Sequence, residues 1–252
     1  MPDALEPAIA PEPGSAPAAA PGRARVEALV EVALCSSLPT QFAVAWVASL
    51  AGLAPFGEDG ALSLPFVVVV SLADTVLLVG LMVALTWARG EHLGDLWLGP
   101  RPATREVLVG LLLVPAVFGL VFVSVLTVRA LVPGLEGLEG NPFERLAGTP
   151  RDAAALGIVG VLAGGVREEL QRAFLLRRFE RHLGGPVVGV VVLSIAFGLG
   201  HIVQGWEAVA ATGVLGAFWA LVYLQRRSVV APVVSHAAFN ALQILALASL
   251  AG

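Results

Sequence analysis

Long runs of apolar residues without a charge dominate this sequence and limit what it can fold into. Residues 32–57 and 107–128 carry no charged side chain, and residues 65–87 carry only Asp74. A helix that crosses the bilayer core needs roughly 20 predominantly apolar residues. The whole chain is only 13% charged, whereas soluble domains carry about 25% charged residues. The sequence therefore predicts an integral membrane protein and argues against a soluble globular enzyme.

Seven apolar segments follow one another with short breaks between them. None alternates with the period of two that a membrane strand of about 10 residues would show. We therefore predict an all-α fold, a polytopic transmembrane helical bundle with about seven spans. The predicted spans are residues 32–57, 65–87, 107–128, 153–180, 183–203, 208–225 and 228–252.

The chain begins with a segment of different composition. Residues 1–24 are rich in Pro and Ala and have no repeating apolar face, which predicts a disordered tail. This segment lacks the basic start and apolar middle of a signal peptide, so we expect the chain to keep its own N-terminus. Residues 25–150 are then a first group of transmembrane helices, and residues 151–252 a second group that holds most of the polar motifs.

Charge and cysteine content narrow the possible partners. The net charge is −4, and all 15 basic residues are arginine, so no basic surface for nucleic acid is expected. The single cysteine, Cys35, cannot form a disulfide within the chain. Arginine-rich loops alternate with arginine-poor ones, which predicts an N-terminus in the cytoplasm.

Three polar motifs interrupt the apolar segments of the second group of helices. They are R-E-E-L-Q-R at residues 167–172, F-G-L-G-H at residues 197–201 and H-A-A-F-N at residues 236–240. Ionisable side chains at membrane depth cost free energy and indicate function by default. Each motif alone also suits a structural role, because His and Asn side chains join helices in membranes.

These three motifs, in this order on three predicted helices, resemble those of one family. It is the CAAX protease and bacteriocin-processing family (CPBP) of intramembrane proteases, also called the abortive-infection family. Its motifs are E-E-x-x-x-R, F-x-x-x-H and H-x-x-x-N, and the second and third are matched in full. In the first motif only two residues separate Glu169 from Arg172. The resemblance covers about residues 150–245 and marks residues 151–252 as a CPBP-like catalytic helical core.

The resemblance implies a hydrolase of the bacterial cytoplasmic membrane. Its substrate would be a membrane-associated protein or peptide, cleaved at a peptide bond within the lipid bilayer. One glutamate and one histidine would activate a water molecule, a histidine and an asparagine would stabilise the oxyanion, and the arginine would hold the carboxylates. The implied catalytic residues, which we expect to line one cavity, are Glu168, Glu169, Arg172, His201, His236 and Asn240.

Helix geometry favours one of the two glutamates as the base and leaves the other as an alternative. Glu168 and Arg172 are spaced i, i+4, so we expect an ion pair between them that keeps Glu168 occupied. Glu169 is then the freer carboxylate and the favoured base, with Glu168 as the alternative. Arg167 is rotated from Arg172 by about 140° and cannot serve as a base.

Other functions stay open. A metalloprotease would bind a divalent metal such as zinc through His201, His236 and Glu169, but the sequence lacks H-E-x-x-H. A non-catalytic immunity-type membrane partner would use the motifs only for packing. A transporter would use them as a proton relay, and it predicts repeated halves, which the sequence does not show.

The arginine alternation makes the topology testable. Reporter fusions after residues 95 and 180 should report the cytoplasm, and fusions at residue 140 and at the C-terminus should report the external side. An external signal from the fusion at residue 95 would contradict the predicted orientation.

Overall fold

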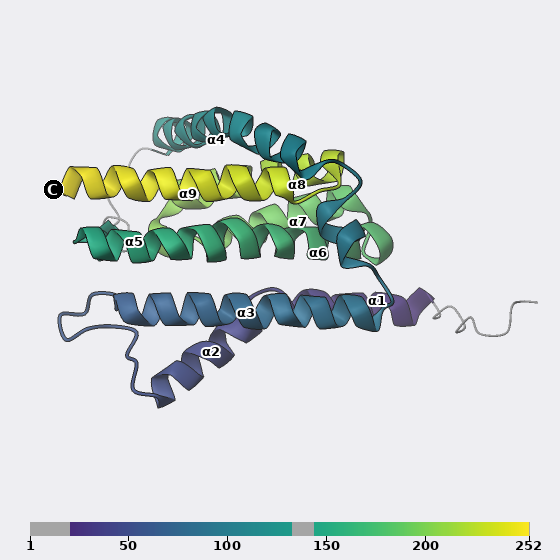
Figure 1. Ribbon diagram of the computed structural model, residues 1–252, viewed down its shortest axis with the longest axis horizontal. Helices are drawn as coiled ribbons and strands as arrows, with labels where there is room; N and C mark the ends of the chain where they lie inside the picture. The colour runs from purple at the N-terminus through teal and green to yellow at the C-terminus, as the bar shows by residue number, and fades with distance from the viewer. Residues whose placement is uncertain (1–20, 133–143, 252) are drawn as a thin grey trace, which may run out of the picture.

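The computed structural model describes residues 21–132 and 144–251, and it confirms the all-α prediction (Figure 1). The described residues form helices and contain no strand, only an isolated bridge between Phe56 and Leu62. Helices in the first half are α1 (Pro21–Leu34), α2 (Leu38–Leu50), α3 (Leu64–Ala88), η1 (Gly94–Leu98) and α4 (Ala103–Leu131). Those in the second half are η2 (Glu144–Ala147), α5 (Pro150–Val159), η3 (Gly160–Arg167), α6 (Glu168–His182), α7 (Pro186–Leu199), η4 (Ile202–Gln204), α8 (Trp206–Arg226) and α9 (Val230–Ala251).

Five helical segments of the described residues are long and apolar enough to cross a membrane. They are Gly22–Leu50, Leu64–Ala88, Gly94–Leu131, Trp206–Arg226 and Val230–Ser249. The other two predicted spans correspond to the charged helix α5–η3–α6 and to the shorter apolar helix α7. Large apolar side chains such as Phe42, Val76 and Leu112 are exposed on the outer faces, as lipid contact requires. The total of seven spans stays a prediction.

The N-terminal boundary differs from the sequence prediction. Residues 1–20 of the predicted tail lie outside the described residues, but α1 already begins at Pro21. Residues 21–24 are therefore helical, because proline suits the first helical turn and Arg23 pairs with Glu27 one turn later. The predicted boundary at residue 150 coincides with the start of α5, although a division into two domains stays a prediction.

The predicted first span is not one continuous helix. It breaks between α1 and α2, where Ser37 adopts a left-handed backbone conformation with φ 71° and Pro39 lies in the first turn of α2. A proline has no amide hydrogen to donate to the preceding turn, so a helix readily restarts there. At this break the carbonyl of Cys35 and the hydroxyl of Ser37 face the interior of the bundle, where both accept hydrogen bonds from the central helix.

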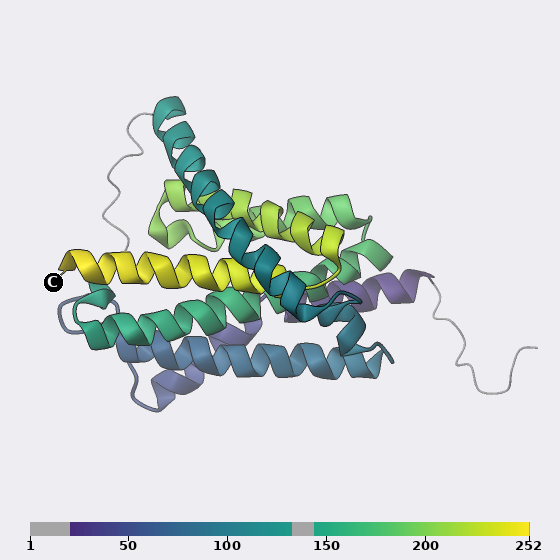
Figure 2. The ribbon, with the colours of Figure 1, turned by 45° about the horizontal axis from the view of Figure 1, so that its top comes forward.

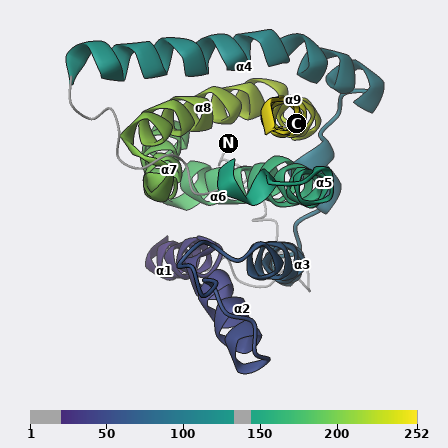
Figure 3. The ribbon, with the colours of Figure 1, turned by 90° about the vertical axis from the view of Figure 1, so that its left-hand side faces the viewer.

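The helices lie in layers, seen end-on in Figure 3. The outermost layer is α4, which crosses α8 and α9 obliquely (Figure 2). Below α8 and α9 lie α5, α6 and α7, and below these lie α1 and α3, with α2 projecting from the bundle. The helix α5–η3–α6 therefore runs through the centre of the molecule, between α9 and α3.

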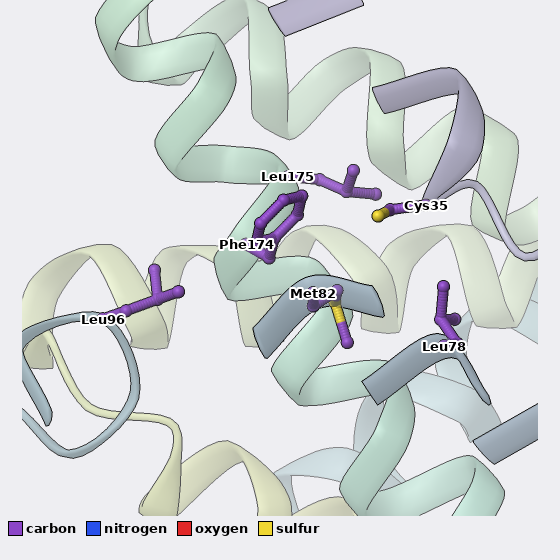
Figure 4. Close-up of a cluster of buried hydrophobic side chains, with 6 residues drawn as sticks. All are labelled: Cys35, Leu78, Met82, Leu96, Phe174 and Leu175. Carbon is purple, nitrogen blue, oxygen red and sulfur yellow. The ribbon is translucent and has the colours of Figure 1, made fainter. Parts of the chain in front are cut away.

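An apolar cluster holds α6 against the first half of the chain (Figure 4). It joins Leu78 and Met82 of α3 to Phe174 and Leu175 of α6, with Cys35 at its edge. The C-terminal end of α6 is fixed by charge, because the fully buried Arg178 pairs with Glu31 of α1 and with Glu91 after α3. The apolar contacts and the ion pairs together hold α6 in the centre of the bundle.

Close packing of η3 on α9 depends on glycine. A methyl group at Gly165 would lie 2.6 Å from Cβ and 2.7 Å from Cα of Ala237. Gly165→Ala should therefore lower the unfolding free energy in detergent by about 1–3 kcal/mol, the usual cost of overpacking. Thermal denaturation checks this. Gly157→Ala in α5, where no atom lies within 4 Å, is the control and should be neutral or stabilising. Equal stability of the two variants would contradict this packing.

Candidate active site

A π-helical segment leads directly into the two glutamates. The helix from residue 150 to residue 182 is π-helical over Gly160–Arg167, and α6 then starts at Glu168. Such segments are rare and often mark functional sites. The side-chain amide of Asn240 on α9 donates to the carbonyl of Gly160 over 2.9 Å. A side chain at Gly164 would overlap the amide of Asn240, so glycine there lets α9 approach the segment.

Glu169, Arg172 and His236 form a buried cluster at the centre of the bundle. Their exposed fractions are 1%, 6% and 5%. Arg172 donates from Nη1 to Oε1 of Glu169, and the same oxygen lies 2.8 Å from Nδ1 of His236. Because a buried charge is tolerated only when it is paired and hydrogen-bonded, these contacts explain how a carboxylate persists here.

The contact with Glu169 also sets the state of the His236 ring. A carboxylate only accepts hydrogen bonds, so Nδ1 of His236 donates to Glu169, and in the corresponding neutral tautomer Nε2 is an acceptor. The ring stacks on Trp219 of α8 with centroids 3.8 Å apart. Trp219 is itself held by donating from Nε1 to Ser235 over 3.0 Å. His236 is therefore fixed in orientation from two sides.

Glu168 is placed differently from its neighbour. Its side chain is 17% exposed, and Oε2 lies 4.0 Å from Nε2 of His236. Its other oxygen, Oε1, lies 3.3 Å from Nη2 of Arg167. Arg167 in turn pairs with Asp74 of α3 over 2.8 Å.

The predicted pairing of the glutamates is thus wrong. Arg172 pairs with Glu169 at spacing i, i+3, and Arg167, which we expected to point away, pairs with Glu168. Arg172 pairs with the carboxylate that is also hydrogen-bonded to His236, because that carboxylate is buried from water and needs a charged partner. Glu169 is therefore not the freer carboxylate, since it is the more buried of the two and contacts both Arg172 and His236.

His201 lies at the end of α7 and meets this cluster through Phe197. Its Nδ1 lies 2.8 Å from the carbonyl oxygen of Phe197, which requires a hydrogen on Nδ1 and leaves Nε2 of the neutral ring free. The Phe197 ring packs against His201 at 4.8 Å and His236 at 6.4 Å between centroids, and the Arg172 guanidinium lies 4.7 Å from it. In the described part of the chain, no hydrogen bond or ion pair joins His201 to either glutamate.

The structure brings most predicted site residues to one region. Glu168, Glu169, Arg172 and His236 surround one another, and Asn240 follows one turn after His236 on α9. His201 is linked to them by aromatic packing alone. Their catalytic roles stay predictions.

The residues predicted to bind a metal do not form a ligand set. Over residues 21–132 and 144–251, no three His, Cys, Asp or Glu side chains are grouped closely enough to hold a metal ion. Oε1 of Glu169, the predicted carboxylate ligand, already contacts Arg172 and His236. The arrangement of His201, His236 and Glu169 in the described residues therefore does not fit a metal ion, and the binding of a divalent metal stays a prediction.

Sequence reasoning missed several residues of the site. Trp219 had no signal, because an aromatic residue in an apolar helix usually only packs. Gln171, Ser37 and Cys35 are linked by two hydrogen bonds, from Ser37 to the Gln171 side chain and from Gln171 to the Cys35 carbonyl. Only Asp74 had a usable signal, as the one charge in its predicted span.

One protein family matches the part of the chain that holds these residues. Residues 150–242 match the family model described as Type II CAAX prenyl endopeptidase Rce1-like. The match spans α5 to most of α9, includes every predicted site residue, and confirms for this part of the chain the resemblance seen in the motifs. Together with the long apolar helices it supports an integral membrane endopeptidase in general terms. Searches of curated proteins and of solved structures give no match.

Arg172 should matter for stability as well as for chemistry. Arg172→Ala leaves Glu169 buried without its guanidinium partner, so we expect a loss of about 3–5 kcal/mol in detergent and lower accumulation. Arg172→Lys should restore part of this, since lysine supplies the charge without the planar fork. Arg23→Ala removes a surface pair and is the control, expected within about 1 kcal/mol of wild type. Wild-type stability of Arg172→Ala would show that the ion pair is not buried.

Proposed function

We propose that this protein is an intramembrane endopeptidase of the CAAX-protease type, with its N-terminus in the cytoplasm of a bacterial cell. Its substrate is a peptide bond of a membrane-associated protein or peptide. The observation that carries the proposal is the pair formed by the Glu168 carboxylate and Nε2 of His236, 4.0 Å apart, beside the fixed Glu169–Arg172 pair. The match of residues 150–242 to a family of prenyl endopeptidases supports it.

The geometry suits activation of a water molecule between two acceptors. A water that donates one hydrogen to Oε2 of Glu168 and the other to Nε2 of His236 presents its oxygen lone pair to a substrate carbonyl. Glu168 takes the proton as the carbon–oxygen bond forms, and it returns the proton to the leaving amine. Glu169 and Arg172 hold His236 and take no proton themselves.

The surroundings of the two glutamates favour Glu168 as the base. Oε1 of Glu169 is engaged by both Arg172 and His236, whereas Oε2 of Glu168 faces Nε2 of His236 and the Glu168 side chain is 17% exposed. Glu168 can therefore meet a water molecule and take its proton, while Glu169 is occupied. We accordingly propose Glu168, which the sequence pattern had placed second, as the base.

Two further residues complete the proposed mechanism. Asn240 uses one of its two side-chain N–H groups for the Gly160 carbonyl, and its second N–H is the proposed donor to the oxyanion. His201 keeps Nε2 available at the end of α7 and is proposed to assist the water or the leaving amine from the side of Phe197.

The test uses purified protein in liposomes and a fluorogenic peptide with a farnesylated C-terminal CAAX sequence. Glu168→Gln should lower turnover by about 10²–10⁴-fold, the usual contribution of a general base, while thermal stability stays near wild type. Glu169→Gln should lower both. Glu180→Gln, farther along α6 in a solvent-exposed pair with Arg227, is the matched control and should keep full turnover.

A second measurement tests the proposed function without assuming a particular peptide substrate. Membrane proteomes of cells carrying Glu168→Gln at the native locus, compared with wild type, should show an uncleaved protein that accumulates. Full peptide turnover in both glutamine variants would contradict the proposed base. No peptide cleavage by the wild type together with identical proteomes would contradict the hydrolase and favour a non-catalytic membrane partner.

A further inference from the structure

Arg167 connects the site to the first half of the chain. Its side chain is 7% exposed, and its guanidinium group contacts four segments of the chain. Nη1 donates to Asp74 of α3 over 2.8 Å and to the Ser37 hydroxyl, in the turn between α1 and α2, over 3.0 Å. Nε donates to the carbonyl of Ala163 within the π-helical segment over 3.3 Å. The remaining nitrogen, Nη2, donates to Oε1 of Glu168 over 3.3 Å.

The two terminal nitrogens of the Arg167 guanidinium group have different partners. Nη1 faces the helices of the first half, and Nη2 faces the active site. A guanidinium group is planar, so Nη2 cannot turn without breaking the bonds made by Nη1. Asp74 and Ser37 therefore fix the direction from which Arg167 reaches Glu168.

We propose that Arg167, held by Asp74, is the positioning residue of Glu168. By engaging Oε1 it leaves Oε2 of Glu168 on the side of His236, where the water is activated. The inference rests on the proposed function and adds to it that the first half of the chain, through α3, takes part in setting the catalytic carboxylate.

Burial shows why Asp74 matters beyond packing. Asp74 is fully buried in α3, and all other residues of this helix are uncharged. Of the two carboxylate oxygens, Oδ2 binds Arg167 and Oδ1 has no partner among the described side chains and backbone. An apolar residue would pack there at lower cost, so the carboxylate is explained by the guanidinium group it holds.

The test compares two substitutions of Arg167 with two measurements. Arg167→Lys keeps a charge that can reach Asp74, but a single ammonium cannot hold Asp74, Ser37 and Glu168 together. We expect near wild-type thermal stability and at least a tenfold lower turnover of the farnesylated peptide. The loss should lie in kcat and not in KM, because a misplaced Glu168 carboxylate impairs the chemical step and not the binding of the peptide. A purely structural role for Arg167 predicts no change in kcat per folded molecule.

The second measurement does not need a substrate. Dicyclohexylcarbodiimide modifies protonated carboxyl groups in apolar surroundings, and peptide mass spectrometry quantifies the modification of Glu168. In Arg167→Met and Arg167→Lys, Glu168 should be modified faster than in wild type, because Nη2 of Arg167 no longer engages its Oε1. Asp74→Asn should produce a smaller change in the same direction, since Arg167 remains but is no longer held.

Glu106→Gln is the matched control. Glu106 is fully buried and pairs with Arg226 through both oxygens over 2.6 Å, joining α4 to α8. Its removal should lower stability and leave the rate of Glu168 modification and the turnover per folded molecule unchanged.

The outcomes separate this inference from the proposed function. Identical rates of Glu168 modification in wild type, Arg167→Lys and Arg167→Met would overturn the positioning role, whether or not the peptide is cleaved. Faster modification in these variants together with absent peptide cleavage by the wild type would support the hold of Arg167 on Glu168 and contradict the proposed hydrolase.

Discussion

The structure depends on one buried ionic cluster, in which Glu169 binds both Arg172 and His236. In an apolar bundle each of these groups is stable only while its partners are present, because water does not replace them. The cluster therefore fixes α6 against α9, and Trp219 extends the constraint to α8 by stacking on His236. The geometry of the candidate site is thus also the geometry that charge burial requires.

Backbone features bring these side chains to the same place. The π-helical segment over Gly160–Arg167 precedes the glutamates, and its glycines let α9 lie close enough for Asn240 to reach the Gly160 carbonyl. At the other end of α6, Arg178 binds Glu31 and Glu91. The central helix is therefore held at both ends by charge, and between them by the apolar cluster around Phe174.

The sequence predicted which residues lie near one another better than it predicted their pairing. An ideal helix places Glu168 on the same face as Arg172, but the angles of a helical wheel describe Cβ directions and not where a long side chain ends. Arg172 instead binds Glu169, the carboxylate that His236 also contacts. Arg167 binds Asp74, which lies nearly a hundred residues earlier in the chain. Neither competing partner can be located from spacing within one helix.

The sequence alone determined the all-α membrane fold and the three motifs, since hydropathy and local spacing act within a single helix. It also indicated the family, which the match of residues 150–242 confirms for that part of the chain. The tertiary structure decided which glutamate Arg172 holds, the break at Ser37, the π-helical segment, and the place of Trp219 and Asp74 around the site. These features depend on contacts between helices far apart in the chain, where burial, and not helical periodicity, selects the partner of each charge.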